Sequence, residues 1–325
     1  MHRLTQDDVR RALPMSEAIE AVKGAFAQLS AGQADVPLRT PLDVPRHNGT
    51  TLIMPAYLSD DDAMAIKIVS VFNDNPDQDL PLIHALVVVM NAETGAPEAV
   101  MDGTYLTALR TGAASGAATD VLARQDAHVA AVFGAGAQGR TQLEAVCAVR
   151  PIEEAVIYDI DQARAERVAD EMSQLLTLPV EAAETPSQAV RSADVVCTAT
   201  TSPRPVFNDA DLRPGTHVNA IGAYTPQMQE IPPETVLRAK VIIDHREAAL
   251  AEAGDLLIPM ENGLITKEHI HAELGEILAG SKTGRESGEE ITLFKSVGVA
   301  VQDVAAARAA LDAARRLGLT TELAL

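Results

Sequence analysis

Aromatic side chains are scarce in this 325-residue chain: Phe, Tyr and Trp together make up 3% of it, and Trp is absent. Apolar residues nevertheless account for 47%, so we expect an interior of aliphatic and alanine side chains. No apolar stretch approaches the roughly 18–20 residues that a transmembrane helix needs. The length suits one large domain or two ordinary ones with a sizeable core.

Cysteine is equally sparse. Cys147 and Cys197 lie inside apparent helix and strand segments and give no disulfide framework. His269 and His271 are two residues apart, a spacing that on a helix does not converge on a metal, so no metal site is expected. The N-terminal sequence MHRLTQDDVRRAL does not resemble a secretion signal. These features predict a soluble, cytoplasmic protein.

Positive charge is the third shortage. The 46 Asp and Glu residues outnumber the 26 Lys and Arg residues, which gives a formal net charge of −20. A surface this acidic repels phosphate backbones, so we expect no nucleic-acid partner. The acidic residues are dispersed rather than gathered in a tail, which is typical of a solvated acidic face.

The first part of the chain combines helix and short strands. An amphipathic helix is predicted at residues 15–33, followed by β-like runs at 50–58, 63–72 and 82–102. Turns rich in Pro, Asn and Asp separate these runs, which favours a mixed or antiparallel sheet. A long Ala-rich helix is then expected at 105–124.

From His128 onward the pattern changes to alternating strand and helix. Near-continuous apolar strands separated by helical segments predict a doubly wound parallel sheet that is covered on both faces. The expected strands span residues 128–133, 154–160, 193–200, 216–223 and 240–245.

The last segment, residues 298–318, is an Ala-rich helix that we expect to return to the first domain. The fold class predicted is therefore α/β, with a Rossmann doubly wound parallel sheet in residues 119–302. A second, mixed α+β domain is expected to combine residues 1–118 with 303–325.

The segment HVAAVFGAGAQGRTQLEAV reads as a strand, a glycine-rich turn and a helix. In this pattern Gly134 allows a tight turn, Gly136 lets backbone N–H groups approach a pyrophosphate, and Gly139 lets the helix pack close to the strand. The next strand ends in Asp159, about 20 residues later, where a carboxylate accepts hydrogen bonds from an adenosine ribose. A dinucleotide site is predicted, against the alternative of a glycine-rich turn without a ligand.

Asp159 also bears on which dinucleotide binds. Its carboxylate would repel a 2′-phosphate, and the residues that follow it, IDQARAER, place no arginine directly beside it. We therefore expect NAD(H) rather than NADP(H), with Arg164 or Arg167 left as side chains that could swing toward a phosphate.

Three cations of the first domain are candidates for a substrate site: Arg39, Lys67 and Arg110. Lys67 stands inside the apolar run AMAIKIVSVF, where burying an unpaired ammonium group is costly. Two arginines can hold a carboxylate, and desolvation lowers the pKa of a buried lysine, which suits it to proton transfer. The alternative is an ordinary buried ion pair, for instance between Lys67 and Asp102.

Several further motifs accompany these residues along the chain: Arg39, MPAY (54–57), KIVSVFNDNP (67–76), NAETGAPEAVMDG (91–103), LTALRTGAASGAAT (106–119), VFGAGAQG, NAIGA (219–223) and FKSVGVAVQD (294–303). Taken jointly, they resemble the ornithine cyclodeaminase/mu-crystallin family over nearly the whole chain. That family implies a homodimer whose first domain builds both the subunit interface and the substrate site.

The resemblance also assigns roles. Arg39, Lys67 and Arg110 match positions that bind the substrate's α-carboxylate and neighbouring groups, and Lys67 is expected to protonate the nascent amine or polarise the C=N or C=O bond. Independently of the resemblance, Asp303 fits a helix position near the domain junction, where it is expected to orient Lys67 or a pocket water, with a structural salt bridge left open. Besides the three glycines, the expected cofactor-binding residues are Arg110, Thr111, Ala137, Gln138, Asp159, Thr200, Val218, Asn219, Ala220 and Ile221.

The sequence departs from the family where ornithine cyclodeaminases carry an acidic residue after NAIGA and a lysine four residues later. Tyr224 and Met228 stand there instead. A neutral Tyr, with a pKa of about 10, is no carboxylate base near neutral pH, which disfavours the conversion of ornithine to proline and ammonia. Tyr224 could instead donate a hydrogen bond to the imine nitrogen or a water, or only line the pocket. Leu82 replaces a hydroxyl that relatives often place near the cofactor.

The reaction predicted is NAD(P)H-dependent reduction of a cyclic ketimine acid, Δ1-pyrroline-2-carboxylate or Δ1-piperideine-2-carboxylate, to the L-amino acid. The first alternative is reductive amination of a 2-oxo acid, as in an alanine dehydrogenase. Ornithine cyclodeaminase activity and a non-catalytic, mu-crystallin-like binding role remain as further alternatives.

Overall fold

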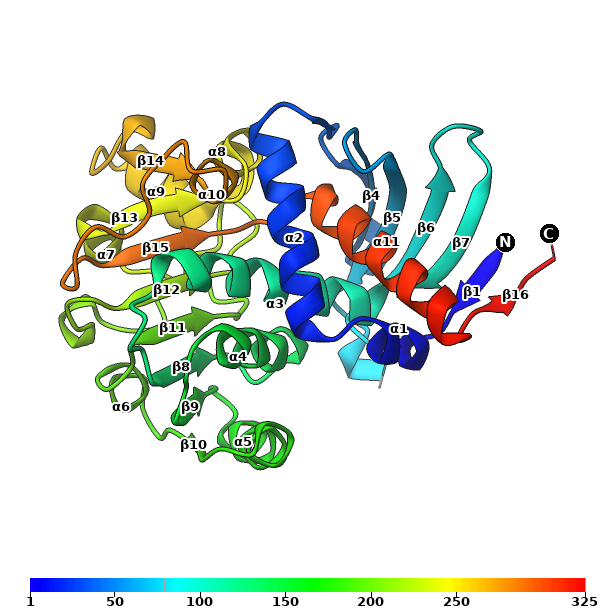
Figure 1. Cartoon of the computed structure of the whole chain (residues 1–325). Coiled ribbons are helices and arrows are strands. Elements are labelled where there is room, and N and C mark those ends of the chain that lie inside the picture. The colour runs from blue at the N-terminus through cyan, green and yellow to red at the C-terminus, as the bar shows by residue number, and fades with distance from the viewer. Residues whose placement is uncertain (79, 325) are drawn as a thin grey trace. The chain divides into compact units, whose positions relative to one another are not determined.

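The computed structural model describes residues 1–78 and 80–324. The chain divides into two compact units, Met1–Arg110 with Val299–Leu325 and Thr111–Gly298 (Figure 1). Each unit contains helices and a sheet, which confirms the predicted α/β class. The boundaries predicted at 118/119 and 302/303 stay a prediction. Among the helices of the described residues, none has both the length and the apolar character to cross a bilayer.

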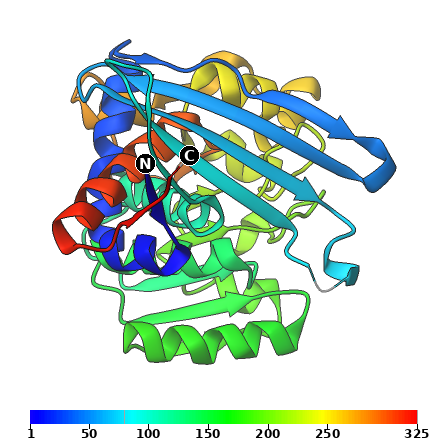
Figure 2. The same cartoon turned by 90° about the vertical axis from the view of Figure 1, so that its right-hand side faces the viewer.

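The first unit is built on one sheet. Its strands span His2–Leu4 (β1), Ala34–Asp35 (β2), Thr40–Val44 (β3), Gly49–Leu58 (β4), Ala63–Phe72 (β5), Ile83–Asn91 (β6), Pro97–Asp102 (β7) and Thr321–Glu322 (β16). The order is β16–β1–β7–β6–β5–β4–β2, and β3 pairs with β4. Only the pairing of β1 with β7 is parallel among these described strands, so the predicted mixed sheet is confirmed. The two termini lie side by side where β1 meets β16 (Figure 2).

Alternation along β4, β5 and β6 gives this sheet two different faces. Met54, Lys67 and Val87 stand opposite one another in register, and all three are buried. The adjacent row of paired residues lies on the other face, where the side chains are exposed: Ile53, Ile68 and Leu86. Lys67 therefore points to the covered face of the sheet, although it carries a charge.

Helices cover the buried face. They are α1 (Gln6–Ala12), α2 (Met15–Ser30) and α11 (Ala300–Leu317), and the unit also has the 3-10 turns Pro45–His47 and Pro76–Gln78. The C-terminal helix α11 packs against β4, β5 and β6 and against α1 and α2 (Figure 1), as expected for a helix that returns to the first domain. It ends at Gly318, whose φ of +66° favours glycine. This packing brings the first turn of α11, with Gln302 and Asp303, onto the face from which Lys67 projects.

The second unit contains a parallel sheet. Its strands span Val129–Phe133 (β8), Glu154–Tyr158 (β9), Val180–Ala182 (β10), Val195–Thr198 (β11), His217–Ala220 (β12), Lys240–Ile243 (β13), Ile270–Glu273 (β14) and Thr292–Lys295 (β15). The order is β10–β9–β8–β11–β12–β15–β13–β14, and every described pairing is parallel. The strand order reverses between β8 and β11, and such a switch point opens a ligand crevice at the carboxyl ends of the strands.

The division between the two units falls within α3 (Gly103–Leu122), which precedes β8. The strands of the second unit are connected by α4 (Ala137–Val149), α5 (Gln162–Leu176), α6 (Pro186–Val190), α7 (Pro233–Arg238), α8 (Arg246–Glu252), α9 (Gly254–Glu261), α10 (Leu274–Leu278) and the 3-10 turns Asp209–Asp211 and Lys267–His269. The prediction missed β10, β14 and β15. It was also wrong to place His269 and His271 on a helix, since they lie in a 3-10 turn and in β14.

Candidate active site

The glycine-rich turn joins β8 to α4 at the carboxyl edge of the parallel sheet. Gly134 has a φ of +103°, a conformation that L side chains rarely adopt. A Cβ added at Gly139 would lie 2.0 Å from the carbonyl oxygen of Gly134, so helix and strand are too close for a side chain. At Gly136, the N-cap of α4, an added Cβ would meet no atom within 4 Å. The turn thus fits the role of a pyrophosphate cradle at an open helix N-terminus.

Asp159 follows β9 and lies beside this turn. Its Oδ2 accepts a hydrogen bond from Ala135 N over 2.8 Å, and its Oδ1 accepts one from Asp161 N over 2.9 Å. Each oxygen keeps acceptor capacity for a hydroxyl group. Ala137 is exposed and Gln138 is half-buried in the first turn of α4. The structure therefore groups these predicted cofactor residues at one edge of the sheet.

The other predicted cofactor residues of this unit lie on β11, β12 and α3. Thr200 follows β11, and its N and Oγ1 donate to Glu230 Oε1 over 2.6 and 2.8 Å. Val218 and Ala220 are buried inside β12, Ile221 follows that strand, and Thr111 is buried in α3.

Asn219 differs from its neighbours because its amide is engaged inside the unit. Its Nδ2 donates to Thr119 Oγ1 over 2.9 Å, and its Oδ1 lies 3.1 Å from His217 Nε2. Burial lowers the pKa of His217 to about 3, so this imidazole is neutral. The side chain of Asn219 thus serves the core of the unit.

Three predicted residues of the first unit meet in one buried cluster. Lys67 Nζ donates to Asp303 Oδ2 over 2.7 Å, and both side chains are buried. Arg110 Nε lies 3.0 Å from Asp303 Oδ1, an ion pair whose atoms are not aligned as a hydrogen bond. Arg110 Nη1 donates to Gln302 Oε1. The alternative partner of Lys67, Asp102, instead accepts a hydrogen bond from the backbone at the start of α3.

The electrostatics of this cluster favour proton exchange. Burial, together with the charge of Arg110, lowers the pKa of Lys67 to about 8, although the Asp303 carboxylate opposes the shift. Arg39 is half-buried between β2 and β3, and its charge also lowers this pKa. Lys67 can therefore exist in both protonation states near neutral pH.

Two residues of the site were missed from the sequence alone. Gln302 directly precedes Asp303, and its place in the motif VAVQD was its only signal. Glu230 lies in the segment QEIPP and is fully buried against the loops that follow β11 and β12. Tyr224, a predicted catalytic residue, is half-buried in the second of these loops.

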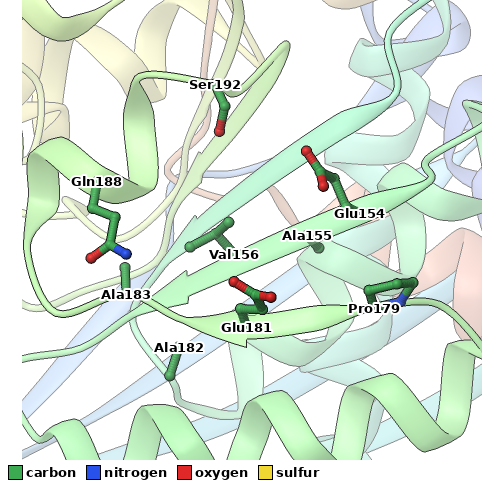
Figure 3. Close-up of a pocket in the computed structure, with 9 residues that line it drawn as sticks. All are labelled: Glu154, Ala155, Val156, Pro179, Glu181, Ala182, Ala183, Gln188 and Ser192. Carbon is green, nitrogen blue, oxygen red and sulfur yellow. The ribbon is translucent and has the colours of Figure 1, made fainter.

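A pocket of about 210 Å³ lies elsewhere in the second unit, against β9, β10 and α6 (Figure 3). Glu154 and Glu181 contribute carboxylates to its lining, and Gln188 and Ser192 contribute neutral polar groups. None of the predicted site residues, all of which the structure describes, lines this pocket. It is separate from the dinucleotide crevice.

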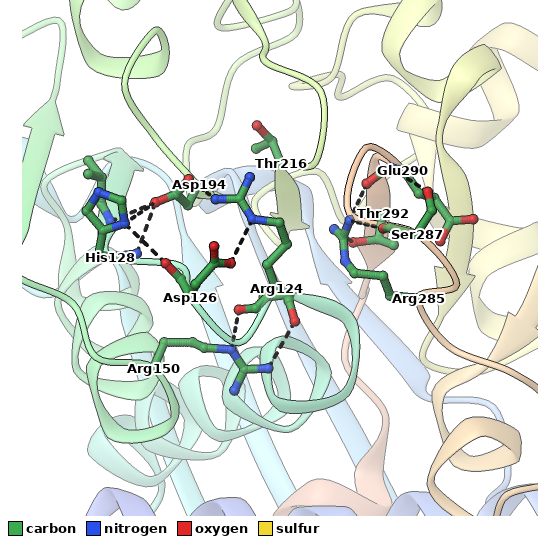
Figure 4. Close-up of polar contacts among 12 residues, drawn as sticks. Arg124, Asp126, His128, Arg150, Asp194, Thr216, Arg285, Ser287, Glu290 and Thr292 are labelled. Carbon is green, nitrogen blue, oxygen red and sulfur yellow. Dashed lines mark hydrogen bonds and ion pairs between the residues drawn. The ribbon is translucent and has the colours of Figure 1, made fainter.

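The amino edge of the same sheet holds a polar network that serves the fold (Figure 4). Arg150 Nη2 donates to the carbonyl oxygens of Thr119, Asp120 and Ala123, and Arg285 Nε donates to that of Leu122. These carbonyls belong to the C-terminal end of α3, where an arginine also interacts favourably with the helix dipole. The network fixes the end of α3.

Comparison with known proteins agrees with this geometry. The family model described as ornithine cyclodeaminase/mu-crystallin family matches residues 2–317. A Δ1-pyrroline-2-carboxylate reductase of Bacillus cereus is 38% identical over 98% of both chains, and an alanine dehydrogenase of Archaeoglobus fulgidus is 39% identical over 94% of this chain and 92% of its own. The solved structure of Thermococcus litoralis Δ1-pyrroline-2-carboxylate reductase in complex with NADH and L-proline is 45% identical, with a TM-score of 0.96 over 99% of this chain and 100% of that one. The chain therefore belongs to the ornithine cyclodeaminase/mu-crystallin family.

Proposed function

We propose that the protein reduces the C=N bond of a small cyclic imino acid, such as Δ1-pyrroline-2-carboxylate or Δ1-piperideine-2-carboxylate, to the L-amino acid with NADH. The observation that carries this proposal is the buried cluster of Lys67, Asp303 and Arg110, which combines a carboxylate-binding cation with a lysine that titrates near neutrality. The relatives named Δ1-pyrroline-2-carboxylate reductase support it.

Each residue of the cluster has a separate task in this scheme. Arg110, aided by Arg39, holds the substrate carboxylate by charge-assisted hydrogen bonds. Lys67 gives its proton to the imine nitrogen, which becomes the amine of the product, and Asp303 holds the ammonium group in place. When bound, NADH supplies the hydride to the imine carbon. Tyr224 lines the pocket or donates a hydrogen bond to the nitrogen.

We infer that the second unit binds the cofactor and that the first unit binds the substrate. The open N-cap at Gly136 suits a pyrophosphate, and the carboxylate of Asp159 suits two ribose hydroxyls and repels a 2′-phosphate. We therefore propose NADH rather than NADPH. In an Asp159→Ser variant, this preference should narrow or reverse, whereas an unchanged ratio of kcat/KM for the two cofactors would contradict the assignment.

Reductive amination of a 2-oxo acid is the second candidate. The relative named alanine dehydrogenase, 39% identical, favours it, and the same cations would hold the 2-oxo acid. Conversion of ornithine is disfavoured because Tyr224 and Met228 provide neither a carboxylate nor an ammonium group.

One assay panel separates these reactions. NADH oxidation is followed with Δ1-pyrroline-2-carboxylate, with Δ1-piperideine-2-carboxylate, and with pyruvate in the presence and absence of ammonia; release of ammonia from ornithine is measured alongside. Turnover with the cyclic imino acids that exceeds turnover with pyruvate and ammonia supports the proposal. The reverse ranking identifies an amino-acid dehydrogenase, and inertness toward the whole panel favours a mu-crystallin-like binding role.

We also propose a homodimer formed through the first unit. Ile53, Ile68 and Leu86 lie in one row across β4, β5 and β6, yet they are 40, 39 and 42% exposed. A continuous apolar sheet face of this kind is typical of protein interfaces. Light scattering should report a dimer that Ile68→Lys dissociates and that Leu175→Lys, on an exposed position of α5, leaves intact. A monomeric wild-type protein would overturn the proposal.

A further inference from the structure

Glu230 is surrounded by hydrogen-bond donors from two separate loops. Its Oε1 accepts from Thr200 N over 2.6 Å and from Thr200 Oγ1 over 2.8 Å. Its Oε2 accepts from Thr198 Oγ1, Gly222 N and Ala223 N over 3.0, 2.6 and 3.1 Å. The side chain is fully buried, so this carboxylate ties the loop after β11 to the loop after β12.

The two loops touch directly at Gly222. A Cβ added there would lie 2.1 Å from the carbonyl oxygen of Thr200 and 2.5 Å from Glu230 Oε1. Because real Cβ atoms essentially never approach so closely, only glycine permits this contact. The position of each loop therefore depends on the other and on the carboxylate between them.

The backbone of Glu230 is also held in place, by a buried aspartate–lysine pair. Its backbone N donates to Asp255 Oδ1 over 2.7 Å, and Asp255 Oδ2 lies 2.9 Å from Lys295 Nζ, with both of these side chains fully buried. Lys295 Nζ also donates to the carbonyl oxygen of Ala220, the last residue of β12, over 3.1 Å. Glu230, which joins the two loops, is thus part of a buried polar network that includes β12, β15 and α9.

We propose that Glu230 is a positioning residue that sets the nicotinamide half of the cofactor site through these two loops; the inference rests on the proposed NADH-dependent function. The glycine-rich turn after β8 and Asp159 after β9 account for the pyrophosphate and the adenosine ribose. A dinucleotide bound across the switch point extends its other half toward β11 and β12. Thr200 and Ile221, both predicted to contact the cofactor, lie in the two loops that Glu230 joins.

The test compares two variants that each neutralise a buried carboxylate of this sheet. Glu230→Gln replaces one acceptor oxygen with an amide NH₂, which faces donors and drives the loops apart. Asp194→Asn is the matched control at the amino edge, where Asp194 accepts from His128 N, Val129 N and Arg124 Nη2 (Figure 4). Thermal stability, the Kd of NADH from its fluorescence, and kcat and KM for the cyclic imino acid are measured for both.

Both variants should lose stability, but only Glu230→Gln should lose catalysis. Its kcat should fall about 10- to 100-fold, since a displacement of about 1 Å at a reacting group can cost 10²-fold. The KM for the imino acid should stay within about twofold, because the substrate cations Arg110 and Lys67 belong to the first unit. Asp194→Asn should keep its kcat and KM. A Glu230→Gln variant with wild-type kcat would show that Glu230 only stabilises the fold.

A second variant covers the case in which Glu230→Gln does not fold. Thr198→Val removes one donor to Glu230 Oε2 without a change in charge, and its kcat should fall a few-fold; an unchanged kcat would overturn the proposal. If the wild-type protein reduces no imino acid, the proposed substrate is wrong, but the positioning role is still tested. The emission of bound NADH must then differ from wild type in Glu230→Gln and not in Asp194→Asn.

Discussion

Each unit of the protein contains a buried lysine–aspartate pair, and these two pairs differ in their surroundings. Lys67 and Asp303 lie 2.7 Å apart in the first unit, and Lys295 and Asp255 lie 2.9 Å apart in the second. Arg110 adds a second cation to the first pair, whereas Glu230 adds a second carboxyl group to the other, and burial together with the charge of Asp255 raises the pKa of Glu230. The first cluster therefore has a surplus of cations and the second a surplus of carboxyl groups.

Hydrogen bonds from the protein's own N–H groups stabilise the surplus carboxyl group of the second cluster. Glu230 accepts hydrogen bonds from Thr200, Gly222 and Ala223 N–H groups, and Asp255 accepts two more backbone N–H bonds. Each cluster contains one ion pair that is not aligned as a hydrogen bond, Arg110 with Asp303 and Lys295 with Asp255. In the first cluster, within the described residues, the donor Gln302 Nε2 also has no hydrogen-bond partner. A buried surplus charge is costly unless a counter-charge meets it. The first cluster thus suits an anionic ligand, and the second suits a scaffold.

The sharpest test of this contrast is Lys67→Met. We expect kcat for imine reduction to fall by about 10²–10⁴-fold, the range that general acid catalysis contributes. Folding should be unaffected, because Arg110 and Asp303 remain as a neutral pair, and NADH should bind with unchanged Kd. Steady-state kinetics and fluorescence titration provide the measurements. A Met variant with near-wild-type kcat would remove Lys67 from the mechanism.

Lys295→Met should have the opposite outcome. It leaves Asp255 and Glu230 buried without a cation, and breaking a buried ion pair in this way costs about 3–5 kcal/mol. Urea unfolding at neutral pH measures the loss, with Lys67→Met as the matched comparison. If the two variants prove equally stable, the assignment of one lysine to function and the other to structure fails.

The sequence analysis predicted a functional role for Lys67 because this lysine stands alone in an apolar strand, a pattern that Lys295 shares. Lys67 stands in AIKIVS and Lys295 in TLFKSV, each a lone lysine within an apolar strand. What no local pattern contains is the partner: Asp303 is 236 positions from Lys67. The sequence analysis named Asp303 as a candidate from its position on the last helix, but only the packing of α11 on β5 brings the two together.

The same limit applies to the fold. The alternation of strand and helix after His128 predicted a parallel sheet because each strand is a local apolar run. The strands β10 and β15 were missed, the first because it is short and polar at its centre, the second because it continues into the segment before α11. The insertion of β15 between β12 and β13 is set by long-range pairing. Residues placed by that pairing, such as Glu230 opposite two loops, were missed as well.

The Arg110→Lys variant tests whether the first cluster binds the carboxylate of the substrate. A lysine keeps the charge but loses the planar fork that holds a carboxylate. The KM for the imino acid should rise about 10- to 100-fold, as expected for the loss of a hydrogen bond to a charged group, with a smaller change in kcat. Arg308→Lys is the control, since Arg308 lies on the same helix as Asp303 but pairs with Glu98 and Asp312. A rise in KM of equal size in both variants would contradict a specific role.

The smallest expected effect is the pH dependence caused by Lys67, which can be measured both in kcat/KM and in the free energy of unfolding. If protonated Lys67 is the acid, kcat/KM for reduction should be level below pH about 8, the pKa of this lysine, and should then fall about tenfold per unit. Oxidation of the amino acid should rise over the same range.

The same lysine should also make stability depend on pH. In the unfolded chain it titrates near 10.5, so between pH about 8 and 10.5 the unfolded state binds more protons than the folded state, and the contribution of Lys67 to stability rises with pH. Urea unfolding across this window should show that rise in the wild type but not in Lys67→Met. A kinetic pKa near 8 that persists in Lys67→Met would assign the titration to another group.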